Sequence, residues 1–193
     1  MSLFFETIKV LDNKAYNLKY HEKRMQKSVS ENFGLKKKFD LFSVIKPPSD
    51  KSFYRCKLYY TKDIEKIEFI KYTPKIIKSF KLVESDLEYR YKFADRSEIE
   101  KLLVKKNGAD DIIILKQGYV RDTSIANLAF FIEGKWITPD TPLLEGTMRA
   151  YLLDRRKIFL GKISIKELKY AKKIAIMNAL IGFREINNFE ILY

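Results

Sequence analysis

Three short stretches decide how this chain is interpreted: Tyr91–Arg96 (YKFADR), Val120–Asn127 (VRDTSIAN) and Glu145–Arg149 (EGTMR). The first carries a lysine, Lys92, directly before a segment that is typical of a helix start. The second carries an acid, Asp122, after a strand-like run. The third places Gly146 ahead of a helix, whose first backbone N–H groups form a natural anion site. Together they offer an amine, an acid and an anion site.

The hydrophobic pattern around these stretches alternates in some segments and follows a helical period in others, so it predicts an α/β (α+β) fold. Strands are expected at 3–10, 53–60, 67–72, 112–115, 128–132 and 135–138. Helices are expected at 18–33, from a capping box at Ser97–Glu100 to about 104, after Gly146 and from Ser164. The pattern predicts a small sheet with a helix packed on it in the first part of the chain, and it weakens around residues 78 to 90, which indicates a connector.

Composition narrows the function classes. The 193 residues are 46% hydrophobic and include a single cysteine, Cys56, and a single histidine, His21, which argues against a disulfide and against a Cys/His zinc site. The net charge of +13 is compatible with nucleic-acid binding, but basic runs such as Lys36–Lys38 are short. A solvated lysine-rich surface, or a cleft for a small anionic substrate, is the preferred interpretation over nucleic-acid binding.

The chain has no apolar run of membrane-spanning length, and residues 1–6 lack the basic head and cleavage site of a secretory signal. We therefore expect no membrane partner and a cytoplasmic location.

The order of several short motifs along the chain resembles the class IV aminotransferase family of pyridoxal 5'-phosphate (PLP) enzymes, of fold type IV. This family includes branched-chain and D-amino acid aminotransferases and 4-amino-4-deoxychorismate lyases. The motifs are Phe5–Ile8, His21–Arg24, Lys92, Gly108–Ile113, Val120–Asp122 with Asn127, Thr138–Pro139, Gly146–Arg149 and Asn178–Leu180.

The resemblance implies roles for individual residues. Lys92 is the catalytic residue that forms the Schiff base with PLP and moves the proton, and such an amine must be partly neutral. Asp122 faces the pyridine nitrogen and keeps it protonated. The phosphate is bound by Arg24, by Thr147 and Met148 at a helix N-terminus, and by the segment of Asn178 and Ala179.

This sequence departs from the family pattern in three respects. Asp122 stands where a glutamate is usual, so the carboxylate is one methylene shorter. Asp95 stands where an asparagine is common, and the chain is shorter than most members. These departures leave the cofactor geometry open.

Within the family, the Asn178–Leu180 segment and the positive charge favour a 4-amino-4-deoxychorismate lyase, which releases pyruvate and 4-aminobenzoate. A class IV aminotransferase is the alternative, and a non-catalytic basic binding module is a further one. Arg55, Arg121 and Arg149 are candidate clamps for substrate carboxylates. The resemblance also implies a homodimer and an architecture of a small N-terminal α/β domain (1–80), a connector (81–90) and a larger, β-rich C-terminal PLP-binding domain (91–193). The basic, aromatic segment Phe53–Tyr60 is a candidate for an interface or cleft.

Overall fold

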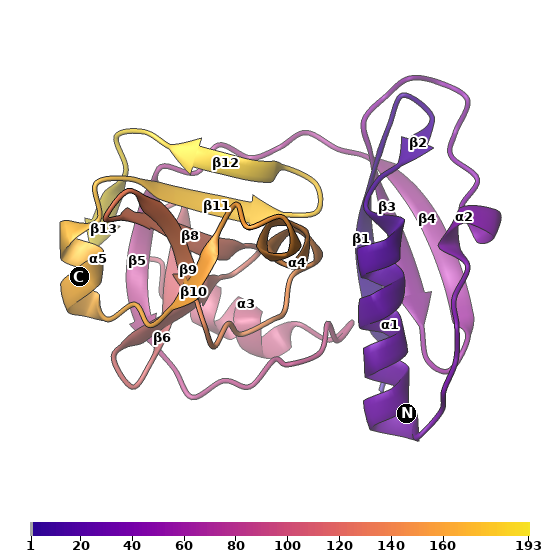
Figure 1. Ribbon diagram of the computed structural model, residues 1–193, viewed down its shortest axis with the longest axis horizontal. Helices are drawn as coiled ribbons and strands as arrows, with labels where there is room; N and C mark the ends of the chain where they lie inside the picture. Colours follow the sequence, from indigo (N-terminus) through magenta and orange to yellow (C-terminus); the bar gives the residue numbers. More distant parts are fainter. Residues whose placement is uncertain (1) are drawn as a thin grey trace. The chain divides into compact units, whose positions relative to one another are not determined.

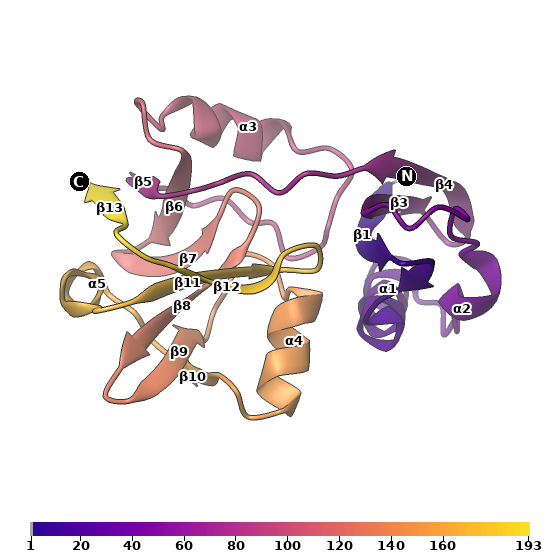
Figure 2. The same cartoon turned by 90° about the horizontal axis from the view of Figure 1, so that it is seen from above.

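A computed structural model describes residues 2–193 (Figures 1 and 2). The chain divides into two units: residues 1–74 with 91–95, and residues 75–90 with 96–193. The expected domain boundaries at residues 80 and 90 stay a prediction. In the structure, 75–90 belongs to the second unit and 91–95 to the first, so the chain passes between the units three times. Helices and sheets occur in both units, so the expected α/β (α+β) class is confirmed.

The first unit is a four-stranded antiparallel sheet with one long helix on a single face (Figure 1). The strands follow the order β2-β1-β3-β4. They are β1 (Phe4–Leu11), β2 (Lys14–Ala15), β3 (Tyr54–Tyr60) and β4 (Ile64–Lys71), and the helices are α1 (Leu18–Phe33) and the short α2 (Leu41–Val44). Met25 and Val29 of α1 pack against Phe4, Ile8 and Leu58 of the sheet.

Strict alternation explains why β1 and β3 form strands. Every second residue of β1 from Phe4 to Val10 is buried toward α1, and β3 alternates in the same way. The β1–β2 turn is made by Asp12 and Asn13, both with positive φ, which these residue types tolerate. Helix α1 ends at Gly34 with a φ of 68°, the left-handed C-terminal stop that the sequence predicts.

The second unit is built on a nine-stranded mixed sheet, seven of whose strands follow the path β10-β9-β8-β7-β6-β5-β13. Strand β11 also pairs with β8 and with β12. The strands are β5 (Ser79–Glu84), β6 (Asp111–Lys116), β7 (Tyr119–Thr123), β8 (Asn127–Ile132), β9 (Lys135–Pro139), β10 (Phe159–Gly161), β11 (Ile174–Asn178), β12 (Gly182–Ile186) and β13 (Glu190–Leu192).

Strand β5 is a correction to the sequence analysis, which assigned its residues to a connector. It lies parallel to β6, with Phe80 opposite Asp111 and Val83 opposite Ile114. Lysine and acid interrupt its pattern, whereas β6 is an unbroken apolar run whose residues 112–115 are all buried. Because β6 is a central strand, β5 is stabilised by a partner that lies about 30 residues away in sequence.

Three short helices complete the second unit: α3 (Ser97–Val104), α4 (Thr147–Asp154) and α5 (Ile165–Tyr170). The expected capping box at Ser97–Glu100 is wrong, because Arg96 is the N-cap residue and Ser97 is already the first helical residue. Arg96 is held there by its Nη2, which donates to the Ser124 carbonyl at 2.8 Å. A capping box does occur at α5, between Ser164 and Glu167.

Within residues 2–193, no helix combines the length and the apolar character that crossing a bilayer requires.

Candidate active site

Lys92 lies in a segment that runs along the free edge of β1. The Phe5 N–H donates to the Lys92 carbonyl at 2.9 Å, and Phe4 and Phe93 form an antiparallel bridge. The rings of Phe4 and Phe93 lie 5.3 Å apart between centroids, on the side of the sheet that α1 covers. Neighbouring residues of an extended chain point to opposite sides, so Lys92 points to the other face. The lysine is therefore held by backbone and aromatic contacts.

The ammonium of Lys92 lies against an aromatic ring of the same unit. Its Nζ is 4.6 Å from the centroid of Phe5, within the range of a cation–π interaction. Phe5 is itself almost fully buried. The edge pairing with β1 fixes the backbone that carries this amine. The catalytic role of Lys92 stays a prediction.

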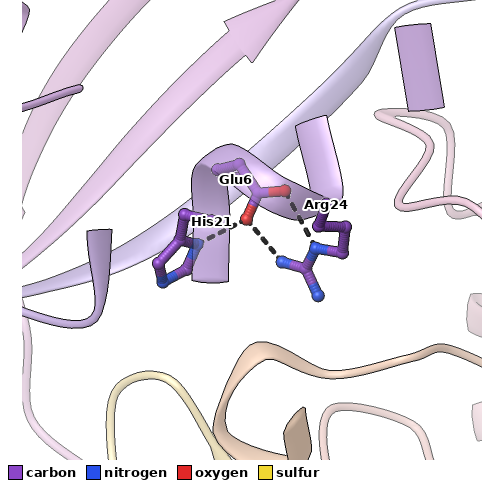
Figure 3. Close-up of polar contacts among 3 residues, drawn as sticks. All are labelled: Glu6, His21 and Arg24. Carbon is purple, nitrogen blue, oxygen red and sulfur yellow. Dashed lines mark hydrogen bonds and ion pairs between the residues drawn. The ribbon is translucent and has the colours of Figure 1, made fainter. Parts of the chain in front are cut away.

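A buried polar cluster lies between β1 and α1 (Figure 3). Glu6 is fully buried, and its carboxylate accepts hydrogen bonds from Arg24 Nε at 2.9 Å and from Arg24 Nη2 at 2.5 Å. It also accepts one from His21 Nδ1 at 2.6 Å. Both carboxylate oxygens are thereby satisfied, as a buried charge requires.

The protonation states in this cluster follow from its contacts. Burial opposes the ionisation of Glu6, but the Arg24 charge and the hydrogen bonds outweigh it and lower the Glu6 pKa to about 2. Burial lowers the pKa of His21, and the charges of Arg24 and Lys92 add to this effect. At neutral pH the cluster therefore consists of a carboxylate, a guanidinium and a neutral imidazole whose Nδ1 carries the proton.

Arg24, the expected phosphate ligand, thus has two of its three nitrogens engaged by Glu6. The third, in Figure 3, points away from the carboxylate. The pairing fixes the orientation of the guanidinium, and its contact with phosphate stays a prediction. The sequence analysis assigned no role to Glu6. The signal for it was an acid on the buried face of a strand, between Phe4 and Ile8.

In the second unit, Asp122 lies on β7 with a fully enclosed carboxylate. Its Oδ1 accepts from Asn127 Nδ2 at 2.7 Å, and its Oδ2 accepts from the Leu144 N–H at 2.9 Å. Burial raises the pKa of Asp122 to about 7, although these hydrogen bonds and the charge of Arg149 partly oppose the shift. An acid in this state would be stabilised as a carboxylate by a cationic N–H group next to it.

Asn127 connects this acid to the start of α4. The same Nδ2 donates to the Leu144 carbonyl at 2.8 Å, and a Cβ built on Gly146 would lie only 1.9 Å from Asn127 Oδ1. Glycine is therefore needed at position 146 because of close approach, since its φ of −69° suits any residue. The sequence analysis quoted Asn127 within a motif but gave it no role.

The N-terminus of α4 suits an anion. Gly146 is its N-cap, no side chain caps it, and its first turn contains no acid, so the backbone N–H groups of Thr147 and Met148 have no acidic side chain of that turn beside them. The side chain of Thr147 is buried at this helix start. Both residues were expected at the phosphate, and they lie three and four residues after Leu144, the partner of Asp122.

The last expected phosphate segment lies at the end of β11. Asn178 Oδ1 accepts from the N–H groups of Leu180 and Ile181, and its Nδ2 donates to the Ile125 carbonyl at 3.3 Å. Its side chain therefore shapes the turn through Ala179 and ties it to the β7–β8 loop. Three of the expected segments, around Asp122, Thr147 and Asn178, are thus linked within one unit.

The three arginines expected to clamp substrate are divided between the two units, and their role stays a prediction. Arg149 is buried and its Nη2 donates to the Pro139 carbonyl at 2.8 Å, so it holds α4 to the end of β9. Arg121 donates to the Thr141 carbonyl at 2.5 Å and alternates with Asp122 along β7, so it lies on the opposite face. Arg55 belongs to β3 of the first unit.

No group of three or more histidine, cysteine, aspartate or glutamate side chains among residues 2–193 is arranged to hold a metal ion. The single cysteine, Cys56, is a buried free thiol whose pKa burial raises to about 12, so it remains a thiol.

Comparison with known proteins identifies a matching family model and several similar proteins. The family model described as Amino-transferase class IV matches residues 91–189. An uncharacterized protein of Haemophilus influenzae is 37% identical over 183 residues, which span 92% of this chain and 97% of that protein. A solved structure from Haemophilus somnus, of a protein provisionally named 4-amino-4-deoxychorismate lyase, is 36% identical, with a TM-score of 0.84 over 94% of this chain and 98% of its own.

A more distant structure shows the same fold. The PLP-bound form of a hypothetical aminotransferase from Mycobacterium tuberculosis is 16% identical, with a TM-score of 0.78 over 97% of this chain and 81% of its own.

Proposed function

The chain belongs to the class IV aminotransferase family, and from this premise we propose that it is a PLP-dependent enzyme, a 4-amino-4-deoxychorismate lyase in which Lys92 carries the cofactor. The observation that carries the choice of reaction is the similarity, over almost the full length of both chains, to the Haemophilus somnus protein provisionally named as this lyase. A Schizosaccharomyces pombe protein with a similar provisional name is 34% identical over 84 residues.

Several residues of this chain suit the proposed cofactor. The uncapped start of α4, at Thr147 and Met148, would bind the phosphate through backbone N–H groups. The enclosed Asp122 carboxylate would accept a hydrogen bond from the protonated ring nitrogen, since each of its oxygens has a lone pair beyond the bond that it already accepts. Arg24, held by Glu6, would add a second contact to the phosphate.

When bound, PLP supplies an electron sink for the carbon that carries the substrate amine. The chain supplies the rest. Lys92 takes the proton from that carbon, and loss of the enolpyruvyl group as pyruvate leaves an aromatic product, 4-aminobenzoate, on the route to folate. Asp122 would keep the ring nitrogen protonated, because a buried carboxylate is stabilised by a cation placed beside it.

The alternative is a class IV aminotransferase acting on branched-chain or D-amino acids, which the family description and the aminotransferases among the solved neighbours favour. Here Lys92 would return the proton to the cofactor, and a second substrate would be required. A non-catalytic basic binding module is the remaining possibility, and the anchored position of Lys92 argues against it. We also propose a homodimer in the cytoplasm, where a single thiol stays reduced.

Two measurements test the proposal. Borohydride reduction of the purified protein with PLP, followed by peptide mass mapping, is expected to label Lys92. A label elsewhere, or no label, contradicts the cofactor assignment. Release of pyruvate and 4-aminobenzoate from 4-amino-4-deoxychorismate, with no amino acceptor present, is expected for the lyase. Absence of that release, together with bleaching of the bound cofactor by D-alanine or by a branched-chain L-amino acid, identifies the aminotransferase instead.

A further inference from the structure

One face of the first unit's sheet is lined by cations that lie on aromatic rings. This basic sheet face, on the side away from α1, is formed by Phe5 of β1, by Arg55, Lys57 and Tyr59 of β3, and by Lys92 of the edge segment. Alternation places them there, because Phe4, Glu6 and Ile8 of β1 and Cys56 and Leu58 of β3 face the helix.

The two lysines of this face share one ring. Phe5 has Lys92 Nζ 4.6 Å from its centroid and Lys57 Nζ 5.2 Å from its centroid, and Lys57 Nζ is also 4.8 Å from the centroid of Tyr59. Both amines therefore lie within about 10 Å of each other, since each is within cation–π range of the same ring. Lys57 is thus the cation that the sheet places nearest to Lys92 along β3.

The positive charge of Lys57 is not neutralised by the chain. Its cross-strand neighbour on β4 is Glu68, but Glu68 is paired with Lys66 at 2.5 Å. Within residues 2–193, no carboxylate forms an ion pair with Lys57. Two residues along the same strand, Arg55 has a buried Nε without a hydrogen-bond partner. Both cations are therefore available to pair with the carboxylates of a ligand.

We propose that Lys57 and Arg55 bind the carboxylates of a dianionic substrate, next to the amine of Lys92. This inference rests on the proposed function, because it places a substrate beside Lys92. Residues i and i+2 of a strand are separated by about 7 Å, so the two cations suit carboxylates that are several bonds apart on one small molecule. The half-buried ring of Tyr59, which packs on Phe5 at 6.3 Å between centroids, would lie against an apolar or cyclic substrate body.

The physical basis is a charge-assisted hydrogen bond at a partly buried position. Lys57 is half-buried, and two aromatic rings contact its ammonium. Partial exclusion of water strengthens its attraction for a carboxylate relative to an exposed lysine. Lys57 would thereby decide between substrates with one and two carboxylates, whereas Lys92 acts on whichever is bound.

The test uses the PLP-loaded protein and two dianions that cannot react through an amine, chorismate and glutarate, with benzoate as the monoanion. Calorimetric titration gives the Kd of each probe for wild type, Lys57→Met and Lys57→Arg. Lys9→Met is the matched control. Lys9 is a cation on the same sheet face, but its Nζ lies over Tyr16 and Phe53, at 5.2 Å and 5.4 Å, rather than over Phe5. Thermal unfolding of each variant checks that it folds.

Lys57→Met is expected to weaken chorismate binding roughly 10- to 100-fold, with benzoate affected less, while Lys57→Arg restores most of the affinity and Lys9→Met changes it by less than about threefold. If Lys57→Met loses affinity for glutarate and not for chorismate, the result supports the same carboxylate-binding site in an aminotransferase and overturns the lyase. Equal Kd values for Lys57→Met and Lys9→Met with both dianions overturn the proposed carboxylate-binding site, whatever the turnover assays show. Failure of wild type to bind either dianion overturns it as well.

Discussion

Asn127 Nδ2 lies 2.7 Å from Asp122 Oδ1, and the same amide nitrogen also donates to the Leu144 carbonyl just before α4. One side chain therefore positions the expected partner of the ring nitrogen and the loop that leads into the expected phosphate site. Because Asp122 is fully buried, its carboxylate depends on these neighbours for hydrogen bonds.

Asn127→Ala is therefore expected to weaken PLP binding by about tenfold or more and to reduce the free energy of unfolding by about 1–3 kcal/mol, since a buried carboxylate oxygen loses its donor. Spectroscopic titration with PLP and urea unfolding measure the two effects. Asn32→Ala removes an equivalent amide from the surface of α1 and should leave the PLP affinity unchanged. Equal affinities for wild type and Asn127→Ala would show that Asn127 does not position the site.

Gly146→Ala is expected to displace Asn127, because the new Cβ would lie 1.9 Å from its Oδ1. Overpacking of this kind costs about 1–3 kcal/mol of stability. A double-mutant cycle isolates the contact. If the clash is with Asn127, Gly146→Ala should cost much less in the Asn127→Ala background than in wild type. Strictly additive costs would mean that the alanine disturbs something else.

Glu6 makes stability dependent on acid pH. Its pKa is lowered from 4.5 to about 2 in the folded state, so the folded state binds fewer protons than the unfolded state between these values. The stabilisation is thus present above pH 4.5 and is lost as pH falls toward 2, by on the order of 3 kcal/mol. Glu6→Gln should be destabilised at pH 7, because Arg24 keeps a buried charge, and its unfolding midpoint should vary less over pH 2–4.5. An unchanged pH profile would show that Glu6 is not the titrating group.

Asp122 makes stability depend on pH in the opposite direction. Its pKa is raised from 3.8 to about 7, so without cofactor the folded state binds more protons, and stability falls as pH rises through this window. The thermal midpoint of Asp122→Asn without PLP should depend less on pH between 4 and 7 than that of wild type. Bound PLP should flatten the wild-type profile, since a cationic ring N–H favours the carboxylate. A variant that retains the full pH dependence would assign the titration to another group.

Lys92→Ala is expected to reduce turnover about 1000-fold or more, whichever reaction the protein catalyses, because it removes both the cofactor attachment and the proton carrier. The reduced peptide map should lose its label at the same time. Lys57→Ala removes a neighbouring lysine on the same ring and should keep the label at Lys92. Turnover in Lys92→Ala close to wild type would rule out Lys92 as the catalytic residue.

The sequence by itself determined the elements whose signal is local. Helix α1 begins and ends where its apolar period and Gly34 predict. The β8–β9 hairpin turns at Glu133 and Gly134, both with positive φ, and the apolar run 112–115 is a buried strand. The order of the motifs also identified the family, because each motif is a short run of consecutive residues that can be recognised without the tertiary structure.

Tertiary structure alone decided the contacts between distant segments. Strand β5 forms because β6 pairs with it, Lys92 is anchored because Tyr91–Asp95 returns to β1, and Arg24 is oriented because Glu6 is buried beside it. The ammonium groups of Lys57 and Lys92 both lie within cation–π range of Phe5, although the two residues are 35 positions apart in sequence. Local periodicity carries no information on such pairings, since they depend on which surfaces become buried together when the whole chain folds.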